Sequence, residues 1–516
     1  MELTAVCCVL GVASISMFFV WRLSNWLWFE PKKKEKLLRD QGFKGSSYKF
    51  MYGDLKDLVH MTSEAKLKPM SVTHDITPRV SPFMHKSFST YGKNIFIWMG
   101  PTPMVQIYEP SMIREILSDY YQFQKPRGGN PLTRLLVTGL ADVNADQWVK
   151  HRKIINPAFH VEKLKYMVPA FYVSCCEMIN KWGEMLTNEG LCEVDVWPHI
   201  QTLTSDVISR TAFGSNFKEG KKIFELQREQ AKLVMKAARS FYIPGLRYFP
   251  TKRNNSMKEI DREMKTTIKS IIDKRVIAMK AGESSKDDLL GILLDSNQKE
   301  IEKHGNRNFG LSIEEVIEEC KIFYFAGQET TANMLVWTMI LLGQHTDWQT
   351  RARDEVLHLF GKRKPDVDGL NHLKIINMIF CEVLRLYPPA TIIRRLIYKE
   401  TKLGNLTLPA HTLVEINPLF LHHDNDIWGD DANDFKPERF SEGVSKVNKG
   451  QASYLPFGGG PRICIGQNFA MLEAKMALVM VLQCFSFELS PSYSHAPHII
   501  ITLQPQFGAH LILHKI

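Results

Sequence analysis

Residues 457–466 read FGGGPRICIG and are followed by a helical run from Asn468 to Cys484. Glycines on both sides of Cys464 allow the backbone to make tight turns and to approach a flat ligand closely. Backbone amides near a thiolate sulfur can hydrogen-bond it and tune its donor strength. A guanidinium such as that of Arg462 binds a carboxylate in a fixed fork. A lone cysteine is usually a buried structural thiol, but this frame of glycine and arginine indicates a cysteine that holds a ligand.

Five positions of this loop carry a resemblance to a known family. They are Phe457, Gly460, Arg462, Cys464 and Gly466. They resemble the cysteine-ligand loop of the cytochrome P-450 superfamily, whose pattern continues in the right order over nearly the whole chain. The resemblance implies haem b, iron protoporphyrin IX, as the cofactor and Cys464 as the metal site, the axial ligand of the haem iron. The other implied cofactor-binding residues of the loop are Phe457, Gly458, Arg462 and Gly466.

Residues 326–331, AGQETT, lie inside a predicted helix at 312–345. This segment resembles the oxygen-activating part of the family's long central helix, where small residues leave room for dioxygen above the iron. The resemblance implies that Thr330 holds the oxygen and its water, while Glu329 feeds protons to it. By itself, a Glu-Thr-Thr triplet is common on solvated helix faces. The catalytic interpretation therefore depends on the cysteine loop.

Two charged motifs downstream resemble a further family feature. Glu382 and Arg385 stand three residues apart on one predicted helix, which must end before Pro388. Taken alone, such a pair is typical of a surface ion pair. Together with Arg439 in the segment 437–440, PERF, it resembles the family's buried Glu-Arg-Arg network. The implied role is structural, behind the haem loop.

Trp148 and Arg152 are one helical turn apart, so the indole and guanidinium N–H groups can point at one acidic group. The pair resembles the helix that contacts a haem propionate, although alone it also fits an aromatic core residue beside an exposed arginine. We interpret His151 and His160 as satisfied core or surface histidines. The segment 140–145, LADVNA, lacks the glycine expected near this turn, which leaves the loop path open.

The N-terminal residues predict a membrane anchor. Leu3 to Trp21 contains no charge and is long enough to cross a bilayer as a helix. Aromatic residues at 26–29 suit the membrane interface, and lysines at 32–34 favour the cytosolic side. The alternative, a cleaved secretory signal, needs a basic start and a shorter apolar core. We predict a single-pass anchor in the endoplasmic reticulum membrane at 1–29 and a haem-thiolate monooxygenase catalytic domain at 30–516 facing the cytosol.

The rest of the chain alternates long helices with short strands. Helical periodicity predicts helices at 161–186, 221–241, 255–281 and 312–345, and β-type runs occur at 95–98, 105–107, 413–416 and 499–503. No long linker, low-complexity stretch or internal repeat divides the chain. The predicted fold class is mainly α with small β-sheets, a cytochrome P-450 fold preceded by one transmembrane helix.

Net charge and cysteine content limit the kinds of binding partner and the compartment that suit this chain. The formal net charge of +10 comes from scattered basic residues without a nucleic-acid module, so it favours anionic lipid or an acidic redox partner over nucleic acid. Nine cysteines without a CxxC pair do not form a disulfide framework and suit a reducing compartment. No GxGxxG or flavin module is present. Electrons should therefore come from NADPH through a separate flavin reductase, NADPH-cytochrome P-450 reductase, docked on the basic face beneath Cys464.

Residues 31–48 and the segment 151–160, HRKIINPAFH, look like a plant microsomal group that oxidises terpenoids, the 72 clan, family 72 subfamily A. This implies an NADPH- and O2-dependent monooxygenase that hydroxylates a bulky apolar terpenoid, with a triterpenoid preferred over a secoiridoid, monoterpenoid or gibberellin-type diterpenoid. The segments expected to shape the pocket are 126–141, 231–250, 316–325, 389–394 and 496–501. Two other classes stay open, a reductase-independent haem-thiolate isomerase and a non-enzymatic haem protein.

Overall fold

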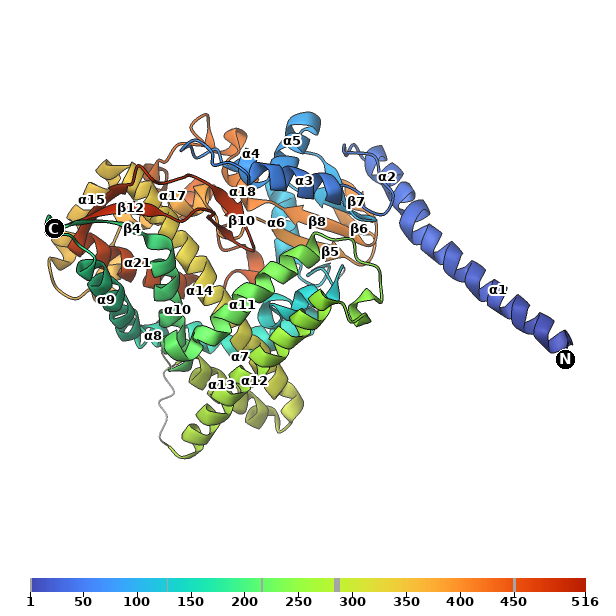
Figure 1. Cartoon of the computed structure of the whole chain (residues 1–516), viewed down its shortest axis with the longest axis horizontal. Coiled ribbons are helices and arrows are strands. Elements are labelled where there is room, and N and C mark those ends of the chain that lie inside the picture. The colour runs from blue at the N-terminus through green and yellow to red at the C-terminus, as the bar shows by residue number, and fades with distance from the viewer. Residues whose placement is uncertain (1, 128, 215–216, 283–287, 449–451) are drawn as a thin grey trace.

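Helices account for most of the chain, and the sheets lie beside them as small units (Figure 1). The computed structural model describes residues 2–127, 129–214, 217–282, 288–448 and 452–516. The predicted class, mainly α with small β-sheets, is confirmed. Gly128, inside the first of the predicted pocket segments, lies outside the described residues.

The helices of the main body have the following bounds. The longer ones are α9 (Val168–Glu184), α10 (Val196–Phe213), α11 (Phe217–Ala238), α12 (Lys252–Lys280), α13 (Leu289–His304), α14 (Ile313–Gln344), α15 (Thr346–Phe360), α17 (Ile375–Leu386) and α21 (Gln467–Cys484). The shorter ones are α3 (Leu55–Ala65), α4 (Thr77–Val80), α5 (Pro82–Tyr91), α6 (Pro110–Ser118), α7 (Ala145–Ile155), α8 (Val161–Lys165), α16 (Val367–His372), α18 (Pro418–His422), α19 (Asn425–Trp428) and α20 (Val444–Asn448).

The N-terminal helix projects away from this body (Figure 1). α1 (Glu2–Ser24) runs through a π-helical turn (Asn25–Phe29) into α2 (Glu30–Asp40). The stretch Cys7–Asp40 is long and apolar enough to cross a membrane, and none of its most apolar window is buried by the protein. Contact with the body includes Trp26, whose ring stacks on that of Phe241, and Leu27, which is buried and whose carbonyl accepts a 2.7 Å hydrogen bond from Tyr48 Oη. An uncovered apolar helix suits a bilayer.

The strands form one five-stranded sheet and three smaller units. The large sheet has the order β1 (Phe96–Met99), β2 (Thr102–Gln106), β8 (Thr412–Ile416), β5 (Ile393–Ile397) and β3 (Phe123–Gln124). The smaller units are the three-stranded sheet β4 (Leu191–Asp195), β12 (His510–Lys515) and β9 (Phe485–Leu489), the pair β6 (Thr401–Leu403) and β7 (Leu406–Leu408), and the pair β10 (Pro497–Ile499) and β11 (Leu503–Pro505). β2 and β8 pair in parallel, whereas the other pairs are antiparallel.

Two predicted elements differ from the structure. The predicted helix 161–186 is two helices, α8 and α9, separated by a turn at residues 166–167. Pro169 stands in the first turn of α9, and proline has no N–H to continue a preceding helix. The predicted strand 499–503 is the reversal of the β10–β11 hairpin, in which Ile499 pairs with Leu503. Its β-branched run favours extended backbone locally, but the tertiary contacts of the hairpin decide the path.

Helix α14 is the centre of the core. It begins with a capping box in which Ser312 and Glu315 bond each other's backbone N–H groups. It packs against α10, α17 and α21, and almost every residue from 331 to 343 is buried. This packing fixes the predicted oxygen-activating segment, 326–331, in the middle of the molecule. The segment faces the same cavity as the loop that carries Cys464.

Candidate active site

A cavity of about 460 Å³ separates α14 from the cysteine loop. Its lining is largely apolar. Of the residues that the sequence singled out, Trp148, Arg152, Thr330, Phe457, Gly458, Arg462, Cys464 and Gly466 line it. Segments from distant parts of the chain therefore meet around one space, as the sequence predicted for the cofactor.

The cysteine loop folds back on itself beneath this cavity. The N–H of Cys464 donates a 3.0 Å hydrogen bond to the carbonyl of Phe457. Gly458 and Gly460 have positive φ of 74° and 65°, in the left-handed region that side chains avoid. A Cβ on Gly460 would lie 2.3 Å from the carbonyl oxygen of Leu117. The glycines are thus required by the backbone path and by a close approach to α6.

The Cys464 thiol opens onto the cavity and is otherwise surrounded by protein. Burial raises the pKa of this thiol, whereas a hydrogen bond from the Gly466 backbone N–H and the nearby Arg152 guanidinium lower it. Arg152 Nη1 donates a 2.8 Å hydrogen bond to the carbonyl of Ile463, which holds the guanidinium beside the loop. Two groups therefore already favour the thiolate, and a bound metal ion would favour it further.

Three cationic side chains lie at the same cavity. Lys125, Arg395 and Arg462 all line it. Burial and the guanidinium groups of Arg395 and Arg462 lower the pKa of Lys125 to about 7. Burial lowers the pKa of Arg395 to about 10, and burial together with the neighbouring Arg395 does the same for Arg462. Sequence reasoning missed Lys125 and Arg395, because neither belongs to a recognisable motif.

Whether haem fits this cavity can be judged from the three cations and from Cys464. Among the described residues, the buried Nε atoms of Arg395 and Arg462 have no hydrogen-bond partner. Buried donors of this kind call for an acceptor, and a porphyrin carries two propionate carboxylates. Apolar walls suit the ring, and the Cys464 sulfur suits the iron. The residues present therefore fit haem b.

Helix α7 presents Trp148 and Arg152 to the cavity. The Arg462 guanidinium lies 4.8 Å from the centre of the Trp148 ring. His151, between them in sequence, is almost fully buried, with Nδ1 2.5 Å from Glu319 Oε1. The interpretation of His151 as a satisfied core histidine is confirmed, and its contact ties α7 to α14.

The open loop path before α7 is resolved by Gly139, one residue upstream of the segment 140–145. Gly139 has a φ of 54°, and a Cβ there would lie 2.9 Å from the Glu319 carboxylate. The Leu140 N–H donates a hydrogen bond to the same carboxylate. The segment 140–145 itself contains no glycine, and Ala145 within it has a φ of 45°, in the left-handed region that favours glycine.

Thr330 and Glu329 point in different directions. Thr330 lines the cavity, and its Oγ1 donates a 2.8 Å hydrogen bond to the carbonyl of Ala326. The Glu329 carboxylate instead accepts hydrogen bonds from Thr502 Oγ1 at 2.8 Å and from Gln504 Nε2 at 3.2 Å. Burial raises the pKa of Glu329, which favours its protonated form. Their roles in oxygen activation stay predictions.

Glu382, Arg385 and Arg439 meet in the core. The Glu382–Arg385 pair is fully buried and joined by two hydrogen bonds of 2.7 and 2.8 Å. Arg385 also donates to the carbonyls of His422 and Ala432. Arg439 Nε lies 3.5 Å from Glu382 Oε1. The three side chains thus form one contiguous charged cluster.

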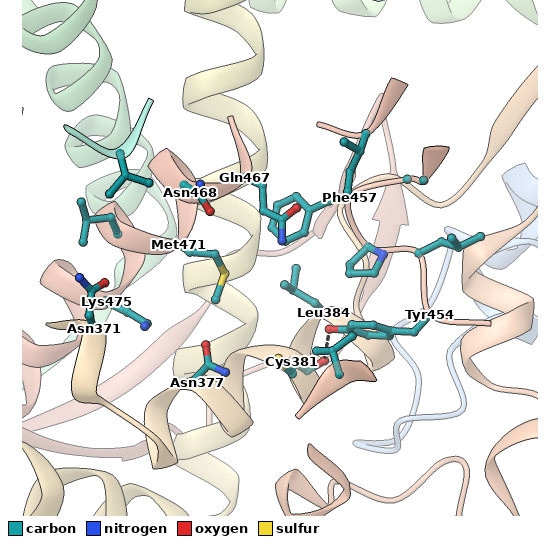
Figure 2. Close-up of a pocket in the computed structure, with 18 of the residues that line it drawn as sticks. Asn371, Asn377, Cys381, Leu384, Tyr454, Phe457, Gln467, Asn468, Met471 and Lys475 are labelled. Carbon is teal, nitrogen blue, oxygen red and sulfur yellow. Dashed lines mark hydrogen bonds between the residues drawn. The ribbon is translucent and has the colours of Figure 1, made fainter. Parts of the chain in front are cut away.

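A second cavity, of about 590 Å³, shares lining residues with the first, and its lining is drawn in Figure 2. Residues that line both cavities are Leu384, Leu455, Pro456, Phe457, Gly458, Gly459 and Ile463. Its other walls carry Gln467, Asn468 and Lys475 from α21, and Tyr454 Oη donates to the Cys381 carbonyl beside it (Figure 2). The cysteine loop therefore stands between a largely apolar cavity and one with several polar groups.

Comparison with known proteins gives consistent matches. The family model "Cytochrome P450" matches residues 74–506. Cytochrome P450 CYP72A219 of Panax ginseng is 62% identical over 96% of both chains. The 7-deoxyloganic acid hydroxylase of Catharanthus roseus is 52% identical over 98% of this chain and 97% of its own. Among solved structures, retinoic acid-bound cyanobacterial CYP120A1 has a TM-score of 0.72 at 24% identity, covering 84% of this chain and 94% of its own, which supports the fold.

Proposed function

The chain belongs to the cytochrome P450 family, within its 72A subfamily, and from that premise we propose that it hydroxylates a bulky apolar plant terpenoid, with a triterpenoid as the first candidate. The chain is a haem-thiolate monooxygenase that depends on O2 and on NADPH through a reductase. The observation that carries the proposal is the largely apolar cavity shared by Cys464 and Thr330.

The residues around the cavity would bind the haem through its iron and its propionate groups. A thiolate-ligated haem iron, when bound, activates dioxygen because the sulfur pushes electron density that favours O–O cleavage. Cys464 would hold that iron, and the loop residues Phe457, Gly458 and Gly466 would shape the sulfur's surroundings. Propionate carboxylates would be held by Arg462, Trp148 and Arg152, and by Lys125 and Arg395.

Thr330 and Glu329 would supply protons. The Thr330 hydroxyl lies in the cavity, where it would orient a water molecule by a hydrogen bond. Glu329 would release a proton to water and regain one from solvent afterwards. Since Glu329 is held on the far side by Thr502, water would have to connect the two side chains. Glu382, Arg385 and Arg439 would act structurally, by fixing the region behind the loop.

A packed apolar cluster lies among the predicted pocket segments, outside the cavity lining as described. It consists of Leu132, Leu136, Ala231, Val234, Ala237 and Met257, with Phe325 and Ile501 packed against it. All of these residues except Met257 come from segments that the sequence assigned to the substrate pocket. A secoiridoid is the second candidate, because a relative 52% identical to this chain is named 7-deoxyloganic acid hydroxylase.

Microsomes that hold this chain, fed a panel of triterpenoids, iridoids and diterpenoids, test the proposal. We expect mass spectrometry to find a hydroxylated triterpenoid only when NADPH and a plant flavin reductase are both present, because the chain has no flavin module of its own. Exclusive turnover of an iridoid would select the second candidate. Product formed with NADPH but without reductase would contradict the assigned electron supply.

Replacing Thr330 by alanine should uncouple electron use from product. The variant removes the hydroxyl that faces the cavity while leaving the helix intact, so we expect product per NADPH to fall roughly tenfold or more, within the range of general acid–base effects. NADPH consumption and product are measured together. Thr330→Ser keeps a hydroxyl and serves as the control. An unchanged product yield in Thr330→Ala would contradict the assigned relay.

We propose that the reductase docks on the side of the protein where the second cavity lies. This cavity shares cysteine-loop residues such as Phe457, Gly458 and Ile463 with the haem cavity. Helix α8 contributes Val161 and Leu164 to its lining and carries the exposed Lys165, which pairs with Glu162 at 3.1 Å. We place the reductase here because lysines attract an acidic partner and because the loop offers a short path to Cys464.

The N-terminal helix supports a membrane location. We assign residues 1–29 to a single-pass anchor in the endoplasmic reticulum membrane and residues 30–516 to the catalytic domain facing the cytosol. Exposed apolar side chains on the body continue the anchor's apolar surface. They include Ile243, Leu246, Tyr248 and Phe249. Phe241, in the same segment, stacks on Trp26 at the foot of the anchor, with the ring centres 6.1 Å apart.

A further inference from the structure

The carboxylate of Glu329 is held by the C-terminal hairpin. Thr502 Oγ1 lies 2.8 Å and Gln504 Nε2 lies 3.2 Å from the same oxygen, Oε1. Gln504 belongs to β11, and Thr502 directly precedes that strand. Neither residue is among those described as lining the cavity of Cys464. The acid of the proposed relay is therefore oriented by residues outside the cavity.

The direction of these hydrogen bonds follows from Asn333. Its Nδ2 lies 2.7 Å from the carbonyl oxygen of Glu329 and 2.9 Å from Thr502 Oγ1. A carbonyl can only accept, so the amide nitrogen donates one hydrogen to each partner. Because Thr502 Oγ1 accepts from Asn333, its own proton is free to point at Glu329. Asn333 thus donates a hydrogen bond to Thr502, and Thr502 donates one to Glu329.

The hairpin that carries Thr502 is itself fixed to the core. Trp337 Nε1 donates a 3.0 Å hydrogen bond to the carbonyl of Leu503. The Leu503 N–H donates to the carbonyl of Pro389 at 3.1 Å. Trp337 is fully buried on α14, one turn beyond Asn333. The backbone next to Thr502 is thereby anchored to α14 and to the Pro389 carbonyl.

Two donors on Oε1 determine where the acidic proton sits. An ionised carboxylate accepts at both oxygens, and a protonated one carries its hydrogen on one of them. Oε1 already accepts one O–H hydrogen bond from Thr502 and one N–H hydrogen bond from Gln504. In the neutral form of Glu329 the acidic proton therefore sits on Oε2. No hydrogen bond to Oε2 is found among the described parts of the chain. A proton on Oε2 thus has no protein acceptor among the described residues.

We propose that Thr502 is a positioning residue for proton delivery, which acts by holding Glu329 Oε1 so that the transferable proton stays on Oε2. The inference rests on the proposed function, because it assigns the proton donor role to Glu329. On release, the Oε2–H bond breaks, water takes the proton, and the negative charge left on the carboxylate is stabilised by Thr502 and Gln504. Reprotonation by water restores the starting state.

Thr502→Val tests the proposal, with Thr502→Ser as the variant that keeps the hydroxyl. Thr338→Val is the matched control, because Thr338 is also a buried threonine, and among the described residues its hydroxyl bonds the Met334 carbonyl of its own helix. We expect Thr502→Val to lower product per NADPH about tenfold, as for the loss of one hydrogen bond to a charged group, and to enlarge the solvent deuterium isotope effect. Thr502→Ser and Thr338→Val should stay within about twofold of the parent.

A second readout does not depend on turnover. The infrared band of the protonated Glu329 carboxyl, identified by its absence in Glu329→Gln, should shift to higher frequency in Thr502→Val, because its carbonyl oxygen loses a donor. Thr338→Val should leave that band in place. Adding Thr502→Val to Glu329→Gln should cause no further loss of coupling, since Thr502 acts through Glu329.

The variants separate two kinds of failure. If Glu329→Gln keeps the parent's coupling, the proton role proposed for Glu329 is wrong, and the inference falls with it. If Glu329→Gln is impaired but Thr502→Val behaves like Thr338→Val in both coupling and infrared band, only the role of Thr502 is overturned. An additive loss in the double variant would likewise show that Thr502 acts by another route.

Discussion

Replacing Cys464 by serine is expected to abolish monooxygenase activity, with a fall of at least about 10³-fold, or about 4 kcal/mol of transition-state stabilisation. A hydroxyl is a far poorer electron donor than a thiolate, so the push that favours O–O cleavage is lost. The loop should still fold, because its path depends on the glycines and on the bond from residue 464 N–H to the Phe457 carbonyl. Turnover and the spectrum of the reduced, carbon monoxide-treated protein measure the effect.

Cys484→Ser provides the control for this variant. Cys484 is a half-buried cysteine at the C-terminal end of α21, the helix that follows the cysteine loop. It is not among the described residues that line the cavity. We expect this variant to keep both activity and the thiolate spectrum. Substantial activity in Cys464→Ser would mean that another group holds the iron.

Replacing Arg385 by alanine is expected to destabilise the catalytic domain by about 3–5 kcal/mol, because the buried Glu382 carboxylate loses its nearest charged partner and keeps Arg439 at 3.5 Å. The substitution also removes the donors that bind the His422 and Ala432 carbonyls. Since a whole domain is stable by only about 5–15 kcal/mol, little haem-loaded protein should accumulate. Thermal unfolding and haem content per chain measure the loss.

Arg351→Ala is the matched control for this prediction. Arg351 pairs with Glu438 at 3.0 Å, but both side chains are about half exposed, at 45% and 57%. An exposed pair of this kind contributes about 0–1 kcal/mol. Equal destabilisation by the two variants would show that the buried cluster has no special structural role.

Short-range patterns predicted the parts of the site that lie within one helix or loop. The glycine-rich loop, the spacing of Trp148 and Arg152, and the Glu382–Arg385 pair all depend on neighbours in sequence, and each appears where the pattern placed it. The long helix α14 formed within one residue of its predicted bounds at both ends, because its periodicity and its Ser312 cap agree.

Contacts between segments that are far apart in the sequence could not be predicted from local patterns. β3 pairs with β5 so that Gln124 faces Leu396, and the next residues, Lys125 and Arg395, come together at the cavity. Nothing in the local sequence around either residue marks that meeting. The turn of Glu329 toward Thr502 has the same origin, because it depends on how the C-terminal hairpin docks on α14.

The central claim is that the sulfur of Cys464 binds the haem iron. The absorption spectrum of the full-length, haem-loaded chain, reduced and treated with carbon monoxide, tests it most directly. We expect the strongly red-shifted Soret band of a thiolate-ligated iron, and its loss in Cys464→Ser. A folded, haem-loaded chain whose Soret band stays at the position typical of histidine ligation would contradict the claim.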